Sequence, residues 1–167
     1  VMWSDTSAIH QILSHAASRI KLEEDIAALV KNEGFDGVDI DFEGKSAEDK
    51  NYFSTFLRGL YQRMGKKWLM CTIEARTPVS SRYEGTPPKA ATVYANDLVQ
   101  INKYCDRVRL MTYDQQTIDQ KLNAAALSAP YVPIADTKWV EKVVNLMAQS
   151  ISKRKIVIGV ATYGYEY

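Results

Sequence analysis

Short apolar runs of β type alternate along the chain with longer segments of helical character. The β-type runs lie at 38–42, 68–75, 107–113 and 155–161. Apolar spacing and terminal capping signals predict helices between and around them, at about 14–32, 46–64, 96–104 and 139–150. Parallel strands need crossover connections, usually helices. The alternation therefore predicts an α/β fold in which helices cover a parallel sheet.

Two architectures share this alternation, a doubly wound sheet and a (β/α)8 TIM barrel. No G-x-G-x-x-G or P-loop sequence follows any of the β-type runs, so nothing specific favours the nucleotide-binding version. The segment 76–94 is rich in Pro, Ser, Thr and Gly and is predicted to be a long loop, a kind of segment that is often functional. The stretch 115–136 is also predicted to be irregular.

The charge balance restricts the classes of partner. Lys and Arg number 21 and Asp and Glu number 20 among the 167 residues, so no basic surface for nucleic acid or an anionic membrane is expected. No apolar run approaches the roughly 20 residues of a membrane helix. We therefore predict neither a nucleic-acid partner nor a membrane span.

The two cysteines, Cys71 and Cys105, each lie in or beside a predicted strand. Buried free thiols are favoured over a disulfide on this pattern, because free Cys is among the most buried residue types. A bond between them and the redox compartment both stay open at this point.

The run FDGVDIDFEG, residues 35–44, places acids inside a β-type stretch. Alternate side chains of a strand face the same way, so Asp39, Asp41 and Glu43 share one face. Apolar residues occupy the other face. Close, buried carboxylates repel one another, which predicts a raised pKa for at least one of them. A general acid needs this property, and Glu43 would stand at the strand end where parallel α/β folds bind substrates.

Three alternative roles for the acids have less support. A solvated edge strand conflicts with the three apolar residues on the opposite face. The sequence DIDFEG imitates the start of an EF-hand loop, but the twelfth position from Asp39 is Lys50, where a Glu is required. A magnesium site built from two carboxylates stays open, although it would lack support from His or Cys.

The stretch DGVDIDFE, residues 36–43, resembles the D-G-x-D-x-D-x-E signature on the fourth barrel strand of glycoside hydrolase family 18, the chitinase family. Two further motifs follow in the same order. LMTYD at 110–114 resembles the M-x-Y-D of strand six, and KIVIGVATYGYEY at 155–167 resembles the strand-seven motif. The resemblance selects the (β/α)8 barrel.

The resemblance also assigns roles to the carboxylates. Glu43 is expected to protonate the glycosidic oxygen and to act later as the base. The substrate's own 2-acetamido oxygen would be the nucleophile, a known exception to the two-carboxylate rule. Asp41 would orient the acetamido group and stabilise the developing positive charge, and Asp39 would pair with Asp41 and tune its protonation. No cofactor is expected.

The second and third motifs supply further expected contacts. Tyr113 would bind the acetamido carbonyl, Asp114 would bind sugar at the mouth of its strand, and Met111 would line the pocket floor. Tyr163 is a weaker candidate for sugar contact.

Two residues of the signature, Asp36 and Gly37, are expected to be structural. No metal ligand is predicted, because His10 and His15 have no Cys or acid at metal-binding spacing.

The resemblance covers about strands three to seven of an eight-stranded barrel, so strands one, two and eight are expected to lie outside the chain. We expect residues 1–167 to be a partial catalytic barrel of a longer protein. The stretch 115–136 lacks the aromatic residues that many chitinases carry there. Its continuation into Trp139 is closer to the bacterial members that act on peptidoglycan or spore cortex.

The predicted activity is hydrolysis of β-1,4 glycosidic bonds next to N-acetylglucosamine, in chitin-like or peptidoglycan glycans, by a secreted or cell-envelope protein. The alternative is a lectin-like member of the fold that binds carbohydrate without cleaving it. Such proteins usually lose the catalytic Glu, and this chain has Glu43. The choice of glycan, endo or exo cleavage and the oligomeric state stay open.

Overall fold

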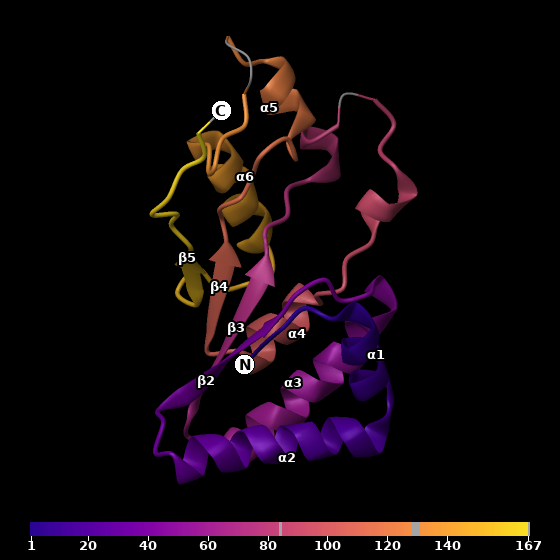
Figure 1. Ribbon diagram of the computed structural model, residues 1–167, viewed down its shortest axis with the longest axis vertical. Helices are drawn as coiled ribbons and strands as arrows, with labels where there is room; N and C mark the ends of the chain where they lie inside the picture. Colours follow the sequence, from indigo (N-terminus) through magenta and orange to yellow (C-terminus); the bar gives the residue numbers. More distant parts are fainter. Residues whose placement is uncertain (84, 128–130, 167) are drawn as a thin grey trace.

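The computed structural model describes residues 1–83, 85–127 and 131–166. In this part of the chain, five parallel strands form one sheet in the order β1-β2-β3-β4-β5 (Figure 1). The strands are β1 (Met2–Trp3), β2 (Gly37–Phe42), β3 (Trp68–Glu74), β4 (Arg107–Met111) and β5 (Ile156–Ile158). The prediction of a parallel α/β sheet is confirmed.

Helices lie in the crossover segments that connect the strands. They are α1 (Thr6–Ser14), α2 (Ala16–Asn32), α3 (Lys50–Met64), α4 (Leu98–Tyr104), α5 (Gln120–Ala124) and α6 (Thr137–Met147). Single 3-10 turns occur at η1 (Ala47–Asp49), η2 (Val79–Ser81) and η3 (Lys89–Thr92). None of the described helices is long and apolar enough to cross a membrane.

Aspartate side chains cap the N-termini of several of these helices. Asp97 accepts hydrogen bonds from two main-chain N–H groups at the start of α4, and Asp136 does the same for α6. Asp5 and Asp119 cap α1 and α5 through one N–H group each. These carboxylates satisfy donors that would otherwise lack an intrahelical partner.

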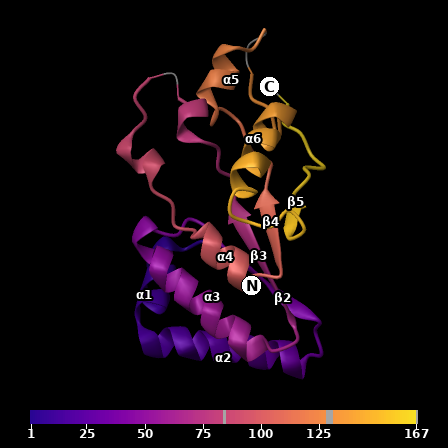
Figure 2. The same cartoon turned by 180° about the vertical axis from the view of Figure 1, so that it is seen from behind.

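The two faces of the sheet differ in character. Ile40 on β2, Cys71 on β3 and Val108 on β4 pair in register and are fully buried. Helices α1 to α4 cover this side of the sheet (Figure 2). The next residues along, Asp41, Thr72 and Arg109, also pair in register and point to the opposite face. One face therefore forms the core and the other carries the polar groups.

The structure corrects several predicted element bounds. The helix expected to begin near residue 14 is α2, and a separate helix, α1, precedes it. The predicted irregular stretch 115–136 contains α5 among its described residues, while residues 128–130 of that stretch lie outside them. The strand expected at 155–161 is only Ile156–Ile158. Propensity and pattern set the ends of an element weakly.

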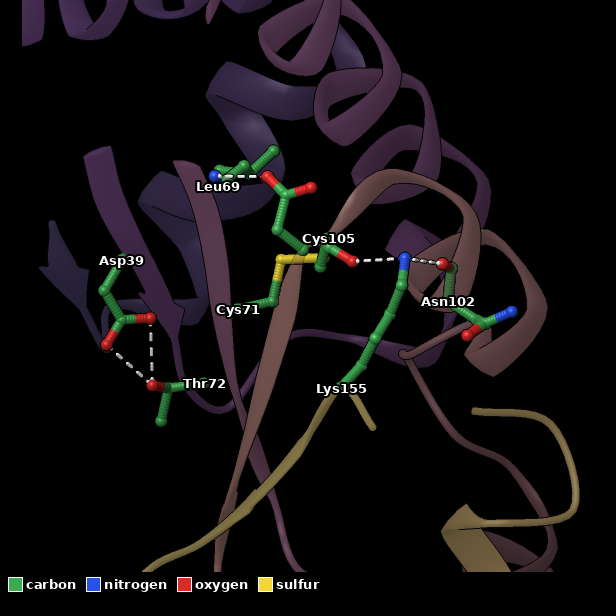
Figure 3. Close-up of a disulfide and its surroundings, with 8 residues drawn as sticks. Asp39, Leu69, Cys71, Thr72, Asn102, Cys105 and Lys155 are labelled. Atoms are coloured by element: carbon green, nitrogen blue, oxygen red, sulfur yellow. Dashed lines mark hydrogen bonds between the residues drawn. A yellow bond between two sulfur atoms is a disulfide. The ribbon is translucent and has the colours of Figure 1, made fainter. Parts of the chain in front are cut away.

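The preference for free thiols is wrong, because Cys71 and Cys105 form a disulfide (Figure 3). The bond joins the middle of β3 to the C-cap of α4 across 34 positions of sequence. Both cysteines are fully buried. The same α4 end is held by Lys155, whose Nζ donates to the carbonyls of Asn102 at 2.6 Å and Cys105 at 2.8 Å. Only the folded sheet and helix bring these groups together.

Gly37 lies where the backbone of β2 packs closely against Trp68 of β3. A Cβ atom at this position would stand 2.3 Å from the main-chain oxygen of Trp68. The neighbouring Asp36 carbonyl accepts the Trp68 N–H at 2.9 Å. These contacts are consistent with the structural roles expected of Asp36 and Gly37, which stay a prediction.

We therefore expect Gly37→Ala to lower the free energy of unfolding by about 1–3 kcal/mol, because overpacking against backbone forces the strands apart. Urea unfolding followed by circular dichroism measures this change. Gly85→Ala is the matched control, since no described atom lies within 4 Å of its Cβ position. Equal midpoints for both variants would contradict the assignment.

Candidate active site

The acidic signature lies at the C-terminal end of β2. Asp39 and Asp41 stand on the polar face of the strand, and Glu43 follows its last residue directly. All three side chains belong to partly exposed residues, whereas Ile40 and Phe42 between them are buried. The alternation predicted from the sequence thus places the carboxylates in a row that opens at the strand end.

Asp39, the first of the three along β2, is held by one donor from β3 and one from β4. The Thr72 hydroxyl on β3 lies 2.8 and 3.0 Å from its two carboxylate oxygens (Figure 3). The Arg109 guanidinium on β4 donates to Oδ2 at 2.8 Å. Asp39 therefore has a fixed orientation and a cationic partner. Neither Thr72 nor Arg109 was predicted from the sequence, because their register against β2 becomes visible only in the sheet.

Among the described residues, Asp41 has no comparable partner. Its Oδ1 atom is buried without a hydrogen bond among the described residues. Burial raises the pKa of Asp41, and the charges of Asp39 and Glu74 raise it further. The expected coupling between Asp39 and Asp41 is thus electrostatic rather than a hydrogen bond. A carboxyl group in this setting keeps its proton to a higher pH than an exposed, isolated one.

Glu43 has a raised pKa for the same reasons. Burial is the largest cause, followed by the charges of Asp41 and Glu74, while Lys45 acts in the opposite direction. Raised carboxyl pKa values are the property that a general acid requires near neutral pH. Glu74 and Lys45 are further residues that the sequence did not single out. A signal for Glu74 existed, since it is an acid near the end of the β-type run 68–75.

Tyr113 lies beside the carboxylates, just after β4. Burial raises the pKa of its hydroxyl, and the charges of Asp41 and Glu43 add to this rise. Gly159, after β5, packs on its ring so closely that a Cβ there would lie 2.7 Å from ring carbon Cε1. Met111 ends β4 in register with Glu74. The structure therefore gathers the expected residues of the first two motifs at the C-terminal ends of β2 and β4, which β3 separates.

Asp114 marks the sharp turn that follows Tyr113. Its backbone adopts a φ of 53°, a left-handed conformation that is uncommon for residues other than Gly. The hydroxyls of Tyr163 and Tyr165 both donate to its Oδ1 atom, at 2.6 and 2.8 Å. This bond to Asp114 is the main cause that raises the pKa of Tyr163 to about 12. Tyr165 is a further residue that the sequence did not single out, and Tyr167 of the same motif lies outside the described residues.

A largely apolar pocket of about 340 Å³ adjoins this tyrosine cluster. Thr112, Ile134, Val140, Gly159 and Tyr163 are among its lining residues. The Thr112 hydroxyl donates to the Gly159 carbonyl at 2.7 Å and joins the ends of β4 and β5. Within the described residues, no three or more His, Cys, Asp or Glu side chains are placed to hold a metal ion.

Known proteins share the sequence pattern of this chain. Residues 2–167 match the sequence profile of Glycosyl hydrolases family 18. The chain is 24% identical to YvbX, an uncharacterised glycosylase of Bacillus subtilis, over 98% of this chain and 43% of that protein. It is 28% identical to YdhD, a candidate sporulation-specific glycosylase of Bacillus subtilis, over 97% of this chain and 35% of that protein.

Solved structures agree with these sequence matches. The crystal structure of YdhD superposes with a TM-score of 0.75 at 29% identity, covering 95% of this chain and 48% of that one. The spore cortex-lytic enzyme SleL of Bacillus megaterium shares the fold, with a TM-score of 0.71 at 19% identity over 93% of this chain and 32% of that one.

The chain thus spans less than half the length of YvbX and YdhD. Its five parallel strands correspond to an incomplete (β/α)8 barrel, so the predicted fold is confirmed. A profile match over residues 2–167, almost all of the chain, shows that it belongs to glycosyl hydrolases family 18.

Proposed function

We propose that this chain carries the catalytic residues of an enzyme that hydrolyses β-1,4 glycosidic bonds next to N-acetylglucosamine. The observation that supports this proposal best is the row of carboxylates at the C-terminal end of β2, where Glu43 directly follows the strand and Asp39 is fixed by Thr72 and Arg109. Burial raises the pKa of Glu43, and a carboxyl group that keeps its proton to higher pH at a strand end of a parallel α/β sheet suits proton transfer to a leaving oxygen. The proposal treats residues 1–167 as one part of the catalytic barrel.

In the proposed reaction, Glu43 donates its proton to the glycosidic oxygen as the C–O bond breaks. The acetamido oxygen of the substrate forms a bond to the anomeric carbon and gives an oxazolinium ion, so no enzyme carboxylate attacks. A water molecule then opens this ring, and its proton passes to the Glu43 carboxylate. The anomeric configuration is retained, because two displacements take place at the same carbon.

The neighbouring groups have separate tasks in this scheme. Asp41 hydrogen-bonds the acetamido N–H and balances the positive charge of the oxazolinium ion, while Asp39 stays fixed by Arg109 and Thr72. Tyr113 donates to the acetamido group from the other side. Asp114, oriented by Tyr163 and Tyr165, binds sugar hydroxyls at the end of β4, and Met111 lines the floor.

We further propose that the substrate is an N-acetylglucosamine polymer outside the cytoplasm, with peptidoglycan or spore cortex preferred over chitin. YdhD is named as a candidate sporulation-specific glycosylase, and SleL as a spore cortex-lytic enzyme. The Cys71–Cys105 disulfide also supports export, since disulfides persist mainly in oxidising compartments.

The experiment that tests the proposal incubates the intact protein with chitin oligosaccharides and with purified peptidoglycan. Mass spectrometry then identifies the products that are released. We expect soluble N-acetylglucosamine-containing fragments, with more release from peptidoglycan. The reducing-end configuration of fresh products, read by NMR, should match that of the substrate. Binding of both polymers without any release would instead support the lectin-like alternative.

A further inference from the structure

Glu74, at the C-terminal end of β3, contacts the backbone directly beside the proposed general acid. Its Oε1 atom accepts the main-chain N–H of Gly44 at 2.9 Å. Gly44 follows Glu43 and adopts a φ of 64°, so the chain turns sharply at this point. The Glu43 N–H itself donates to the Trp3 carbonyl of β1 at 2.8 Å. The peptide groups on both sides of Glu43 are therefore tied to neighbouring strands.

The other oxygen of Glu74 is held equally well. Oε2 accepts from Asn96 Nδ2 at 3.0 Å and lies 3.8 Å from Lys45 Nζ. Asn96 is buried and precedes α4, at the end of the long loop that follows β3. The Tyr94 hydroxyl donates to the Glu74 carbonyl at 3.0 Å. Glu74 thus connects that loop to the turn after Glu43.

Lys45 is an unusual partner, because its side chain is fully buried. Its Nζ donates to the Phe42 carbonyl and lies 4.7 Å from the centre of the Phe53 ring. Burial lowers the pKa of this lysine, and the charge of Glu74 is the largest cause acting against that change. A buried cation without an anionic partner would be costly, so Glu74 and Lys45 support one another.

We propose that Glu74 is a positioning residue for Glu43. Glu74 fixes the turn behind the general acid, and its negative charge, balanced by Lys45, keeps the proton on Glu43. This inference rests on the proposed hydrolysis. The charged and titratable groups around Glu43 are Asp41 on β2, Glu74 on β3, Lys45 in the following turn and Tyr113 after β4. Of these, Glu74 and Lys45 also bond to the residues next to Glu43, Glu74 at the Gly44 N–H and Lys45 at the Phe42 carbonyl.

Two variants are expected to shift the alkaline limb of the pH profile of kcat/KM in opposite directions. Glu74→Gln keeps an oxygen that can accept the Gly44 N–H but removes the negative charge, so Glu43 should lose its proton at lower pH. The alkaline limb of the kcat/KM profile should then move down by about one pH unit, the low end of shifts caused by neighbouring charges. Lys45→Met removes the opposing cation and should move this limb up. Loosened packing alone would lower rates without moving the limb in opposite directions.

The experiment combines pH profiles of hydrolysis with an NMR titration of ¹³C-labelled glutamate carboxyls in the intact protein, assigned for Glu43 by its Gln variant. Glu33→Gln, an exposed substitution at the C-cap of α2, is the control and should leave both profiles in place. An unchanged Glu43 titration in Glu74→Gln, or shifts of the same sign in both variants, would overturn the inference. If the parent protein hydrolyses no glycan, the proposed function fails, and the titration still decides whether Glu74 controls the Glu43 proton.

Discussion

Glu43→Gln is expected to lower the rate of glycan hydrolysis by a factor on the order of 10²–10⁴, the usual contribution of a general acid and base. Gln has nearly the same shape as Glu but carries no proton that the leaving oxygen can take. Asp41 is expected to stay at the acetamido group, so it should not replace Glu43. Product release measured by mass spectrometry on matched amounts of both proteins gives the rate ratio.

Three measurements make this result specific. Thermal unfolding should give nearly the same midpoint for Glu43→Gln and the parent, since no described hydrogen bond of the Glu43 side chain is lost. Calorimetry should show that the variant still binds oligosaccharide. Glu48→Gln, at a side chain that is 70% exposed on η1, should keep the parent rate. Retained turnover in Glu43→Gln would contradict the proposed acid.

Loss of the Cys71–Cys105 disulfide should produce the largest change in stability. The bond closes 34 positions of sequence, and removing such a crosslink lowers the free energy of unfolding by about 2–4 kcal/mol. Urea unfolding should therefore shift to lower concentration when reductant is added to the parent protein. The double variant Cys71→Ala/Cys105→Ala should be destabilised to a similar degree and should no longer respond to reductant.

A chemical count of thiols tests the bond itself. Without reductant, iodoacetamide should modify neither cysteine even in denaturant, and both should react once a reductant is present. Two reactive thiols in denaturant alone would show that the purified protein lacks the bond. In that case the support that the disulfide gives to export would also disappear.

The sequence predicted the main features of the fold because its patterns are local. The alternation of apolar runs and amphipathic segments indicated a parallel α/β sheet, and the period of two in DGVDIDFE placed Asp39, Asp41 and Glu43 on one face. It did not predict α1, and it overestimated the length of the last strand. The apolar residue Val160, which the pattern placed in that strand, lies beyond its observed end at Ile158 and is exposed, so composition alone overstated how far the strand continues.

The residues that surround the acids show most clearly what could not be predicted from the sequence. Nothing in the local sequence joins Arg109 to Asp39, 70 positions away, or Glu74 to Gly44, 30 positions away. Strand register decides both contacts, and register depends on how the whole sheet packs against its helices. The same reason explains the disulfide, which the pattern around Cys71 and Cys105 did not favour.

The sequence by itself therefore determined which chemical groups are present and on which face of their strand they stand, because alternation along a strand is fixed by backbone geometry. Only the tertiary structure decided how those groups behave. The raised pKa values of Asp41 and Glu43 follow from burial, from the neighbouring carboxylate on β2 and from Glu74 on β3, and the buried lysine beside Glu74 exists only in the folded chain. Proton affinity depends on the surroundings of a carboxyl group in space, and distant segments of this chain supply those surroundings.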